Sequence, residues 1–151
     1  HGNLIGIVED DEEYINSLKE IIKGNGGIYL ANPIDFENLI IDSETNKNNE
    51  SSINLKTHST VLKSMLNHDG ITIISNKGKV IGYHILIDSY LNEGDVVIGG
   101  ARSKAFKSME NCNLFTICFY KSQDGNLKIW EKKWMKYKYG KAQMDWNFLL
   151  L

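Results

Sequence analysis

Residues 70–87 of the chain read GITIISNKGKVIGYHILI. Both ends of this stretch are rich in β-branched and other apolar side chains, which favour strands. Between them, residues 76–78, Asn-Lys-Gly, are of the types that form tight turns. The stretch therefore predicts a hairpin in which residues 70–75 pair with residues 79–87.

Helices are expected on both sides of this hairpin. Residues 57–67 place apolar side chains at helical spacing, and Thr57 or Ser59 could cap the start of that helix. Residues 95–98 have the composition of a short strand. A glycine pair follows, and residues 101–111 then gather apolar side chains on one helical face.

The N-terminal part of the chain predicts two amphipathic helices and a polar segment. Residues 10–23 form an apolar stripe between charged positions, and an aspartate pair at the start supplies a candidate cap. Residues 36–41 repeat the pattern over a shorter length. Residues 43–52 contain no apolar side chain, so we expect a mobile loop inserted within one domain.

The C-terminal part predicts a second strand pair and a basic, aromatic end. Residues 114–120 and 127–130 have strand composition and are joined by turn-forming residues. Residues 132–151 interleave five lysines with tryptophan and tyrosine. Such a segment could contact nucleic acid or a partner protein, or it could be a terminal helix whose aromatic side chains pack on the core while the lysines stay in water. We expect the helix.

Length and composition fit one globular domain spanning residues 1–151. Of the 151 residues, 42% are hydrophobic and 10% aromatic, which suffices to bury a core. The order of elements predicts an α/β fold, with a twisted mixed sheet of about six strands flanked by helices. The formal net charge is −2, so no overall positive field would hold the chain on nucleic acid or an anionic membrane. We expect neither as a partner.

Nothing in the sequence predicts a membrane segment. No apolar run approaches the ~20 residues that span a bilayer, and the first residues lack the basic and apolar regions of a signal peptide. We therefore expect a cytoplasmic protein, or the soluble part of a longer one. Cys112 and Cys118 lack the spacing of a metal site and predict buried free thiols.

His68-Asp69-Gly70 stands where the expected helix of residues 57–67 meets the first hairpin strand. A carboxylate at such a sheet edge can hold a divalent metal ion or accept a proton from a hydroxyl group. A glycine there lets a flat ligand approach the backbone closely. Asp-Gly is also a common turn dipeptide, and taken alone these residues fit a plain turn better.

Gly99-Gly100-Ala101-Arg102-Ser103-Lys104 runs from an expected strand into an expected helix. Glycines leave room for a bulky anion, and the first N–H groups of a helix point at it with the helix dipole behind them. Arginine and lysine add positive charge, and serine adds a hydroxyl donor. The segment is a candidate phosphate-binding turn, less diagnostic than a Walker A loop, which the chain lacks.

Together, in this order and spacing, the two motifs resemble the catalytic domain of the diadenylate cyclases, the family that makes cyclic di-AMP from two ATP molecules. That family has an Asp-Gly-Ala motif, often preceded by His, and later a Gly-Thr-Arg-His-Arg motif that begins a helix. The resemblance covers about residues 57–130. It implies an adenine-nucleotide site in which Asp69 is the catalytic carboxylate and the ligand of Mg²⁺ or Mn²⁺, Gly70 lies beside the base, and Arg102 binds phosphate. The other nucleotide-binding residues expected are His68, Gly99, Gly100, Ala101, Ser103 and Lys104.

The sequence departs from the family pattern at three places. Ile71 replaces the alanine of the first motif, Ala101 replaces the threonine of the second, and Ser103-Lys104 replace its His-Arg. Loss of the threonine hydroxyl and of the histidine removes two donors that would meet a triphosphate, and lysine cannot reproduce the planar fork of arginine. Losing one preorganised donor can slow a reaction ~10²-fold or more, whereas binding survives such losses better.

Three functions follow as hypotheses. The first is a domain of the diadenylate cyclase type that binds ATP or cyclic di-AMP and could act as a sensor of ATP or of the second messenger cyclic di-AMP. The second is an active cyclase, a nucleotidyltransferase, in which Asp69 and a metal ion prepare the ribose hydroxyl and residues 102–104 hold the departing pyrophosphate. It needs two facing sites, and hence a homodimer or higher homo-oligomer. The third is an interaction module that keeps the fold and binds no nucleotide.

Overall fold

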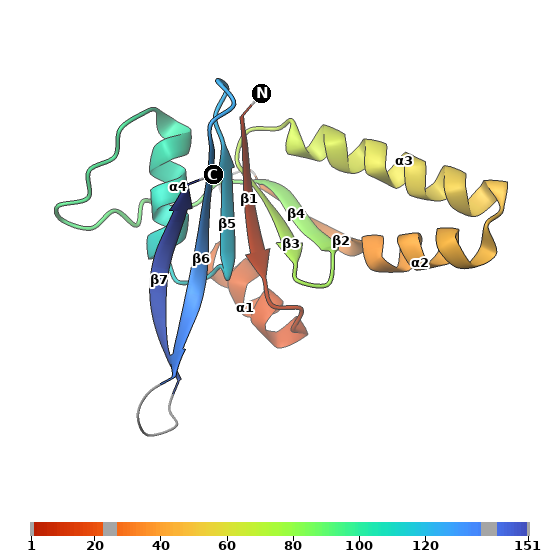
Figure 1. The fold of residues 1–151 in the computed structure, drawn as a ribbon, viewed down its shortest axis with the longest axis horizontal. Coiled ribbons are helices and arrows are strands. Elements are labelled where there is room, and N and C mark those ends of the chain that lie inside the picture. The colour runs from red at the N-terminus through yellow and green to blue at the C-terminus, as the bar shows by residue number, and fades with distance from the viewer. Residues whose placement is uncertain (1, 23–26, 137–141, 151) are drawn as a thin grey trace.

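The computed structural model describes residues 2–22, 27–136 and 142–150, which form one mixed sheet and four helices (Figure 1). The elements are β1 (Asn3–Val8), α1 (Glu12–Ile21), β2 (Ile28–Asp35), α2 (Phe36–Asn46), α3 (Asn49–Leu66), β3 (Ile71–Ser75), β4 (Lys79–Ile85), α4 (Ala101–Asn111), β5 (Ile117–Lys121), β6 (Leu127–Lys136) and β7 (Ala142–Leu150). The seven strands are ordered β2-β4-β3-β1-β5-β6-β7, with β1 and β3 parallel and the other neighbouring pairs antiparallel. The expected α/β fold with a mixed sheet flanked by helices is confirmed.

The expected hairpin lies inside this sheet. β3 and β4 pair antiparallel, and the turn between them ends at Gly78, whose φ of 77° is one that glycine favours. β3 also pairs in parallel with β1, so that Leu4 lies beside Ile71 and Val8 beside Ser75. The starts of β1 and β3 therefore meet at one edge, and their ends meet at the other.

One face of the sheet forms the main core. Alternate residues of a strand point to the same face. The registers accordingly place these buried side chains together: Leu4, Val8, Ile71, Ile73, Cys118, Tyr120 and Trp130. Ile15 and Leu18 of α1, with Phe106 and Met109 of α4, complete the same cluster, and each such burial stabilises the fold by about 1.5–3 kcal/mol. The packing of α4 on this face fixes the position of its N-terminal turn.

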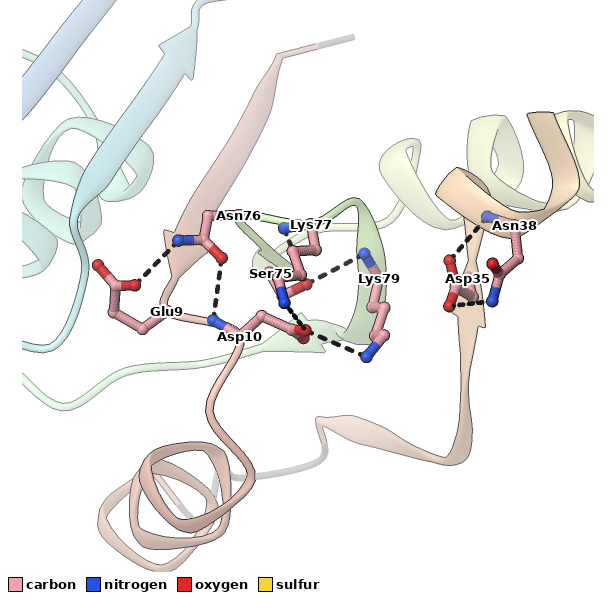
Figure 2. A network of polar contacts seen from close by, with 8 residues as sticks. All are labelled: Glu9, Asp10, Asp35, Asn38, Ser75, Asn76, Lys77 and Lys79. Carbon is pink, nitrogen blue, oxygen red and sulfur yellow. Dashed lines mark hydrogen bonds and ion pairs between the residues drawn. The ribbon is translucent and has the colours of Figure 1, made fainter. Parts of the chain in front are cut away.

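A polar network joins the ends of β1 and β3 (Figure 2). Asn76 Nδ2 donates to Glu9 Oε2 at 2.9 Å, and Asn76 Oδ1 accepts from the Asp10 backbone N–H at 3.0 Å. Lys79 Nζ donates to Asp10 Oδ2 at 3.1 Å. Burial alone would raise the pKa of Asp10, but hydrogen bonds from Lys79 and Ser75 and the charge of Lys79 outweigh it, so the pKa is lowered. The network holds the β1–α1 connection against the β3–β4 turn.

The expectation of a mobile loop at residues 43–52 is wrong. α2 and α3 run through this segment, with only Lys47 and Asn48 between them. Lys47 has a left-handed φ of 49°, and Asn48 Oδ1 accepts from the Ser51 N–H at 2.8 Å, which caps α3. The two helices contact each other and form a hairpin that extends beyond the sheet (Figure 1).

Three further expectations from the sequence are wrong. Thr57 and Ser59 do not cap a helix, because both lie inside α3. Residues 95–98 are not a strand, because the chain from residue 86 to residue 100 contains no helix or strand. The C-terminal segment, residues 132–151, is not a helix: its described residues belong to β6 and β7, which pair antiparallel. Residues 137–141 and 151 lie outside the described part of the chain.

The two cysteines are free thiols, as expected, although only Cys118 is buried and Cys112 is half-buried. Burial raises the pKa of the Cys118 thiol well above its ordinary value and the pKa of Cys112 to about 11. Both therefore stay protonated near neutral pH and are poor nucleophiles. Among the helices of the described residues, none has the length and apolar character that crossing a membrane requires.

Candidate functional site

The two sequence motifs line one pocket. Asp69 and Gly70, just before β3, share a cavity of about 740 Å³ with residues 99–103, at the start of α4. Leu86 and Ile98 add apolar side chains to its wall. The sheet and the β5–β6 turn contribute Leu4, Tyr120, Ser122, Gln123, Asp124, Asn126 and Lys128. The volume lies in the range of small-molecule sites.

Asp69 and Arg102 form an ion pair in this pocket. Arg102 Nη2 donates to Asp69 Oδ1 at 2.5 Å. The Asp69 side chain is 76% exposed and the Arg102 side chain 27% exposed, so the guanidinium is the more deeply seated partner. A Cβ added to Gly2 would lie 3.2 Å from Arg102 Nη1. The guanidinium is therefore held between Asp69 and the start of β1.

The N-terminus of α4 is open to an anion. The other three helices are capped by Asp11, Asp35 and Asn48, whose side chains accept from first-turn N–H groups. α4 instead begins after Gly100, which has no side chain to cap it, and its first turn contains no acid. Uncapped N–H groups and the positive end of the helix dipole favour a bound phosphate or carboxylate.

Gly99 holds the turn before α4 in a conformation that glycine favours. Its φ is 125°, and a Cβ at this position would lie 2.5 Å from Ser103 Oγ. The Ser103 side chain thus occupies the space that a larger residue at position 99 would need. Ser103 Oγ also lies 3.4 Å from the Tyr120 hydroxyl oxygen, in a buried hydrogen bond. This contact joins the first turn of α4 to β5.

His84 holds the backbone of Asp69. Its Nδ1 lies 2.5 Å from the Asp69 carbonyl oxygen, and because a carbonyl only accepts, that nitrogen carries the proton. His84 has a φ of 55°, uncommon for a residue other than glycine. Gly70 has a φ of 94°, and a Cβ there would lie 2.8 Å from the His84 carbonyl carbon. This close approach positions the Asp69 carboxylate at the pocket.

His68 and Lys104 lie outside the pocket, although both belong to the motifs. The His68 ring packs near Tyr83 and His84, with centroid distances of 5.4 and 6.0 Å. Lys104 is exposed on α4. Neither residue is among those that line the pocket in the described part of the chain. Their placement gives no support to the nucleotide contacts expected of them.

Tyr120 and Lys128 line the pocket but belong to neither motif. They are direct partners in the β5–β6 register, so their side chains share one face of the sheet. Neither residue type marks a site by itself, and only the register brings the two together. Residues 122–126 were expected as a turn and do form one, with the Ser122 N–H donating to the Asn126 carbonyl at 2.8 Å. From the sequence, residues 123–125 fit a plain turn better than one side of the pocket, yet Gln123 and Asp124 also line the pocket.

A metal ion at Asp69 would need further ligands from a bound nucleotide. Within the described residues, no group of three or more His, Cys, Asp or Glu side chains is arranged to hold a metal ion. Asp69 and Asp124 both line the pocket, and Mg²⁺ commonly takes one or two carboxylates and completes its shell with water and substrate phosphates. These residues fit an ion that enters with a nucleotide, and Asp69 would then have to release Arg102.

Comparison of the chain with known protein families, with curated proteins and with solved structures gives no match. The likeness to the diadenylate cyclases rests on the two motifs and their spacing alone.

Proposed function

We propose that this chain is a nucleotide-binding domain that takes ATP or cyclic di-AMP in the pocket between Asp69 and the N-terminus of α4. The observation that carries the proposal is that the Asp-Gly motif and the glycine-rich turn, far apart in sequence, line the same pocket. A phosphate group at the start of α4 would meet uncapped N–H groups and the Arg102 guanidinium, which can bind two of its oxygens at once.

Other parts of the pocket suit a flat, largely apolar ring. Leu86 and Ile98 line it with side chains that are 43% and 86% exposed. Gly70 adds bare backbone at the edge of the sheet. An apolar surface with a few convergent polar groups is a common setting for a small ligand. The preference for adenine comes from the resemblance to the cyclases.

Binding is favoured over turnover by the residues around Arg102. Ala101 has no hydroxyl group, and Lys104 is exposed and does not line the pocket. A departing pyrophosphate would therefore lack two side-chain donors that the family's second motif provides, and fixed donors supply much of the rate in phosphoryl chemistry. A sensor needs affinity alone and tolerates their loss.

An active cyclase is the second candidate, favoured by the position of Asp69 in the same pocket. Each ribose 3′-hydroxyl must attack the α-phosphate of the opposite nucleotide, so this function requires two copies with facing pockets. Mg²⁺ or Mn²⁺ at Asp69 would supply charge for that chemistry. A homodimer or higher homo-oligomer is thus part of the cyclase candidate and no part of the sensor.

Calorimetric titration of the purified chain with ATP and with cyclic di-AMP tests the proposal. We expect saturable binding, a loss of about tenfold or more in Arg102→Ala, and no loss in Lys56→Ala, a control that removes an exposed cation of α3. Ligand at ~100 times its Kd should also add about 2.7 kcal/mol to the free energy of unfolding. Absence of binding to both nucleotides would overturn the proposal and favour an interaction module.

Incubation with ATP and Mn²⁺, followed by chromatography for cyclic di-AMP, separates the sensor from the cyclase. Product that disappears in Asp69→Asn would establish the cyclase, because a contaminating enzyme would be unaffected. Nucleotide binding without product would establish the sensor.

A further inference from the structure

A row of side chains runs across the sheet at the pocket. Leu4 of β1 is paired with Tyr120 of β5, and Tyr120 is paired with Lys128 of β6. Directly opposed residues on neighbouring strands point to the same face. All three line the pocket, so the pocket extends along this row from β1 to Lys128 of β6.

Tyr120 connects Lys128 to the phosphate-binding turn. Lys128 Nζ lies 5.5 Å from the centre of the Tyr120 ring, and the hydroxyl of that ring lies 3.4 Å from Ser103 Oγ. Ser103 is the neighbour of Arg102 in the first turn of α4. The face of an aromatic ring attracts a cation without neutralising it, so the charge of Lys128 is left for an anion in the pocket.

Lys128 has no acidic partner among the described residues, since none of their ion pairs includes it. Glu110 is influenced by its charge but pairs with Lys107 Nζ at 3.0 Å. Arg102, in contrast, is engaged by Asp69. An entering phosphate can meet Lys128 without displacing a carboxylate.

Lys104 does not line the pocket, although Arg102, two residues earlier, does. Successive residues of an α-helix are rotated by about 100°, so Lys104 lies about 200° around the helix axis from Arg102. Arg102 lines the pocket, and Lys104 is exposed outside it.

We propose that Lys128 is the second phosphate-binding cation of this pocket, in the role that the motif resemblance gives to Lys104. The inference rests on the proposed nucleotide function and adds a binding residue to it. It places the phosphates between the start of α4 and the β5–β6 strand pair.

The test compares Lys128→Met with Lys104→Met, matched variants that each remove one ammonium group and keep most of the side-chain volume. ATP affinity is measured by calorimetry in EDTA for both variants, for the wild type and for Lys128→Arg. We expect Lys128→Met to weaken ATP binding about tenfold or more, Lys104→Met to change it less than about threefold, and Lys128→Arg to retain most of the affinity. The salt dependence of ATP affinity should also become shallower in Lys128→Met alone.

The outcomes distinguish this inference from the proposed function. If the wild type binds neither ATP nor cyclic di-AMP, the nucleotide function fails and the inference fails with it; if it binds cyclic di-AMP alone, the same variants are compared with that ligand. If the wild type binds but Lys128→Met binds equally well, or if Lys104→Met is the variant that loses affinity, the inference is overturned while nucleotide binding stands. Thermal unfolding of each variant without ligand shows whether a loss of ATP affinity reflects impaired folding. If Lys128→Met folds poorly, the ATP affinities of Lys128→Arg and Lys128→Gln are compared instead, since only Lys128→Arg keeps the charge.

Discussion

Arg102 and Asp69 are bonded to each other across 33 positions of sequence, with Nη2 donating to Oδ1 at 2.5 Å. The resemblance to the cyclases assigns these two groups to different parts of a ligand, the guanidinium to phosphate and the carboxylate to a metal ion. In this structure each is the other's partner. A phosphate must therefore compete with Asp69 for Arg102, and a metal ion must compete with Arg102 for Asp69.

This competition predicts the effect of Asp69→Asn on binding. Replacing the carboxylate with a neutral amide weakens its bond to the guanidinium and takes one negative charge from the pocket. In EDTA we expect ATP affinity to rise about two- to tenfold, a modest change because the carboxylate is largely exposed and screened by solvent. The measurement is calorimetric titration of wild type and variant side by side.

Asp124→Asn is the matched control for that titration. It removes the same charge from the same pocket but releases no arginine, so we expect a smaller gain than in Asp69→Asn. Weaker ATP binding by Asp69→Asn in EDTA would contradict the competition and would instead indicate that the carboxylate contacts the nucleotide directly.

A second prediction concerns Gly99. In Gly99→Ala the new Cβ would stand 2.5 Å from Ser103 Oγ at a φ of 125°, so both the backbone and the first turn of α4 must shift. Gly94→Ala meets a similar φ of 92° with no atom within 4 Å of the new Cβ. We expect Gly99→Ala to lower the free energy of unfolding by about 1 kcal/mol or more beyond Gly94→Ala, as measured in urea, and to weaken ATP binding. Equal losses of unfolding free energy in the two variants would show that the Ser103 side chain moves away from the new Cβ at no cost.

The parts of the fold that could be predicted are those with strong local signals. Asn76-Lys77-Gly78 indicates the turn of the β3–β4 hairpin, and the glycine pair before an apolar helical face indicates α4. The facing ends of α2 and α3, residues 43–52, lack such a signal because these helices bury little: α2 buries no side chain and α3 only Ser51. A helix that packs little has no need of an apolar stripe, so residues 43–52 look like a loop in sequence. Caps and helix propensity form these helices instead.

The site was only partly predictable for a related reason. Asp69 and residues 99–103 could be found because each motif is contiguous in sequence. Tyr120 and Lys128 could not, because what brings them together is the pairing of β5 with β6 and the contact of Ser103 with the Tyr120 hydroxyl. Lys104 was expected in the pocket from its place in the motif, and the rotation of the helix carries it outside.

The cap of α3 gives a third prediction. Asn48→Ala removes the acceptor that bonds the Ser51 N–H at 2.8 Å, and we expect a local loss of about 1 kcal/mol. Because α2 and α3 form a hairpin that extends beyond the sheet, hydrogen exchange should quicken at the first amides of α3 and stay unchanged in β3. Asn49→Ala, one residue into the helix, is the control and should leave exchange unaltered. Faster exchange throughout the sheet would mean that the hairpin is coupled to the core.

The Asp10 network predicts how stability changes in acid. The pKa of Asp10 is lowered in the folded protein, so the folded state binds its proton less readily than the unfolded chain. Such a group stabilises the fold above its ordinary pKa of 3.8, and the contribution disappears as the pH falls through the lower, folded value.

The pKa of Lys79 is raised, chiefly by its hydrogen bond with Asp10, so the contribution of Lys79 is lost only as the pH rises above 10.5. Urea unfolding of wild type and Asp10→Asn should therefore differ most near neutral pH, and the difference in the free energy of unfolding should shrink as the pH falls below 3.8. The double variant Asp10→Asn/Lys79→Met should lose less free energy of unfolding than the sum of the losses in the two single variants, because the two side chains interact with each other. A gap between wild type and Asp10→Asn that stays constant down to pH 2 would show that Asp10 acts through its shape and hydrogen bonds and not through its charge.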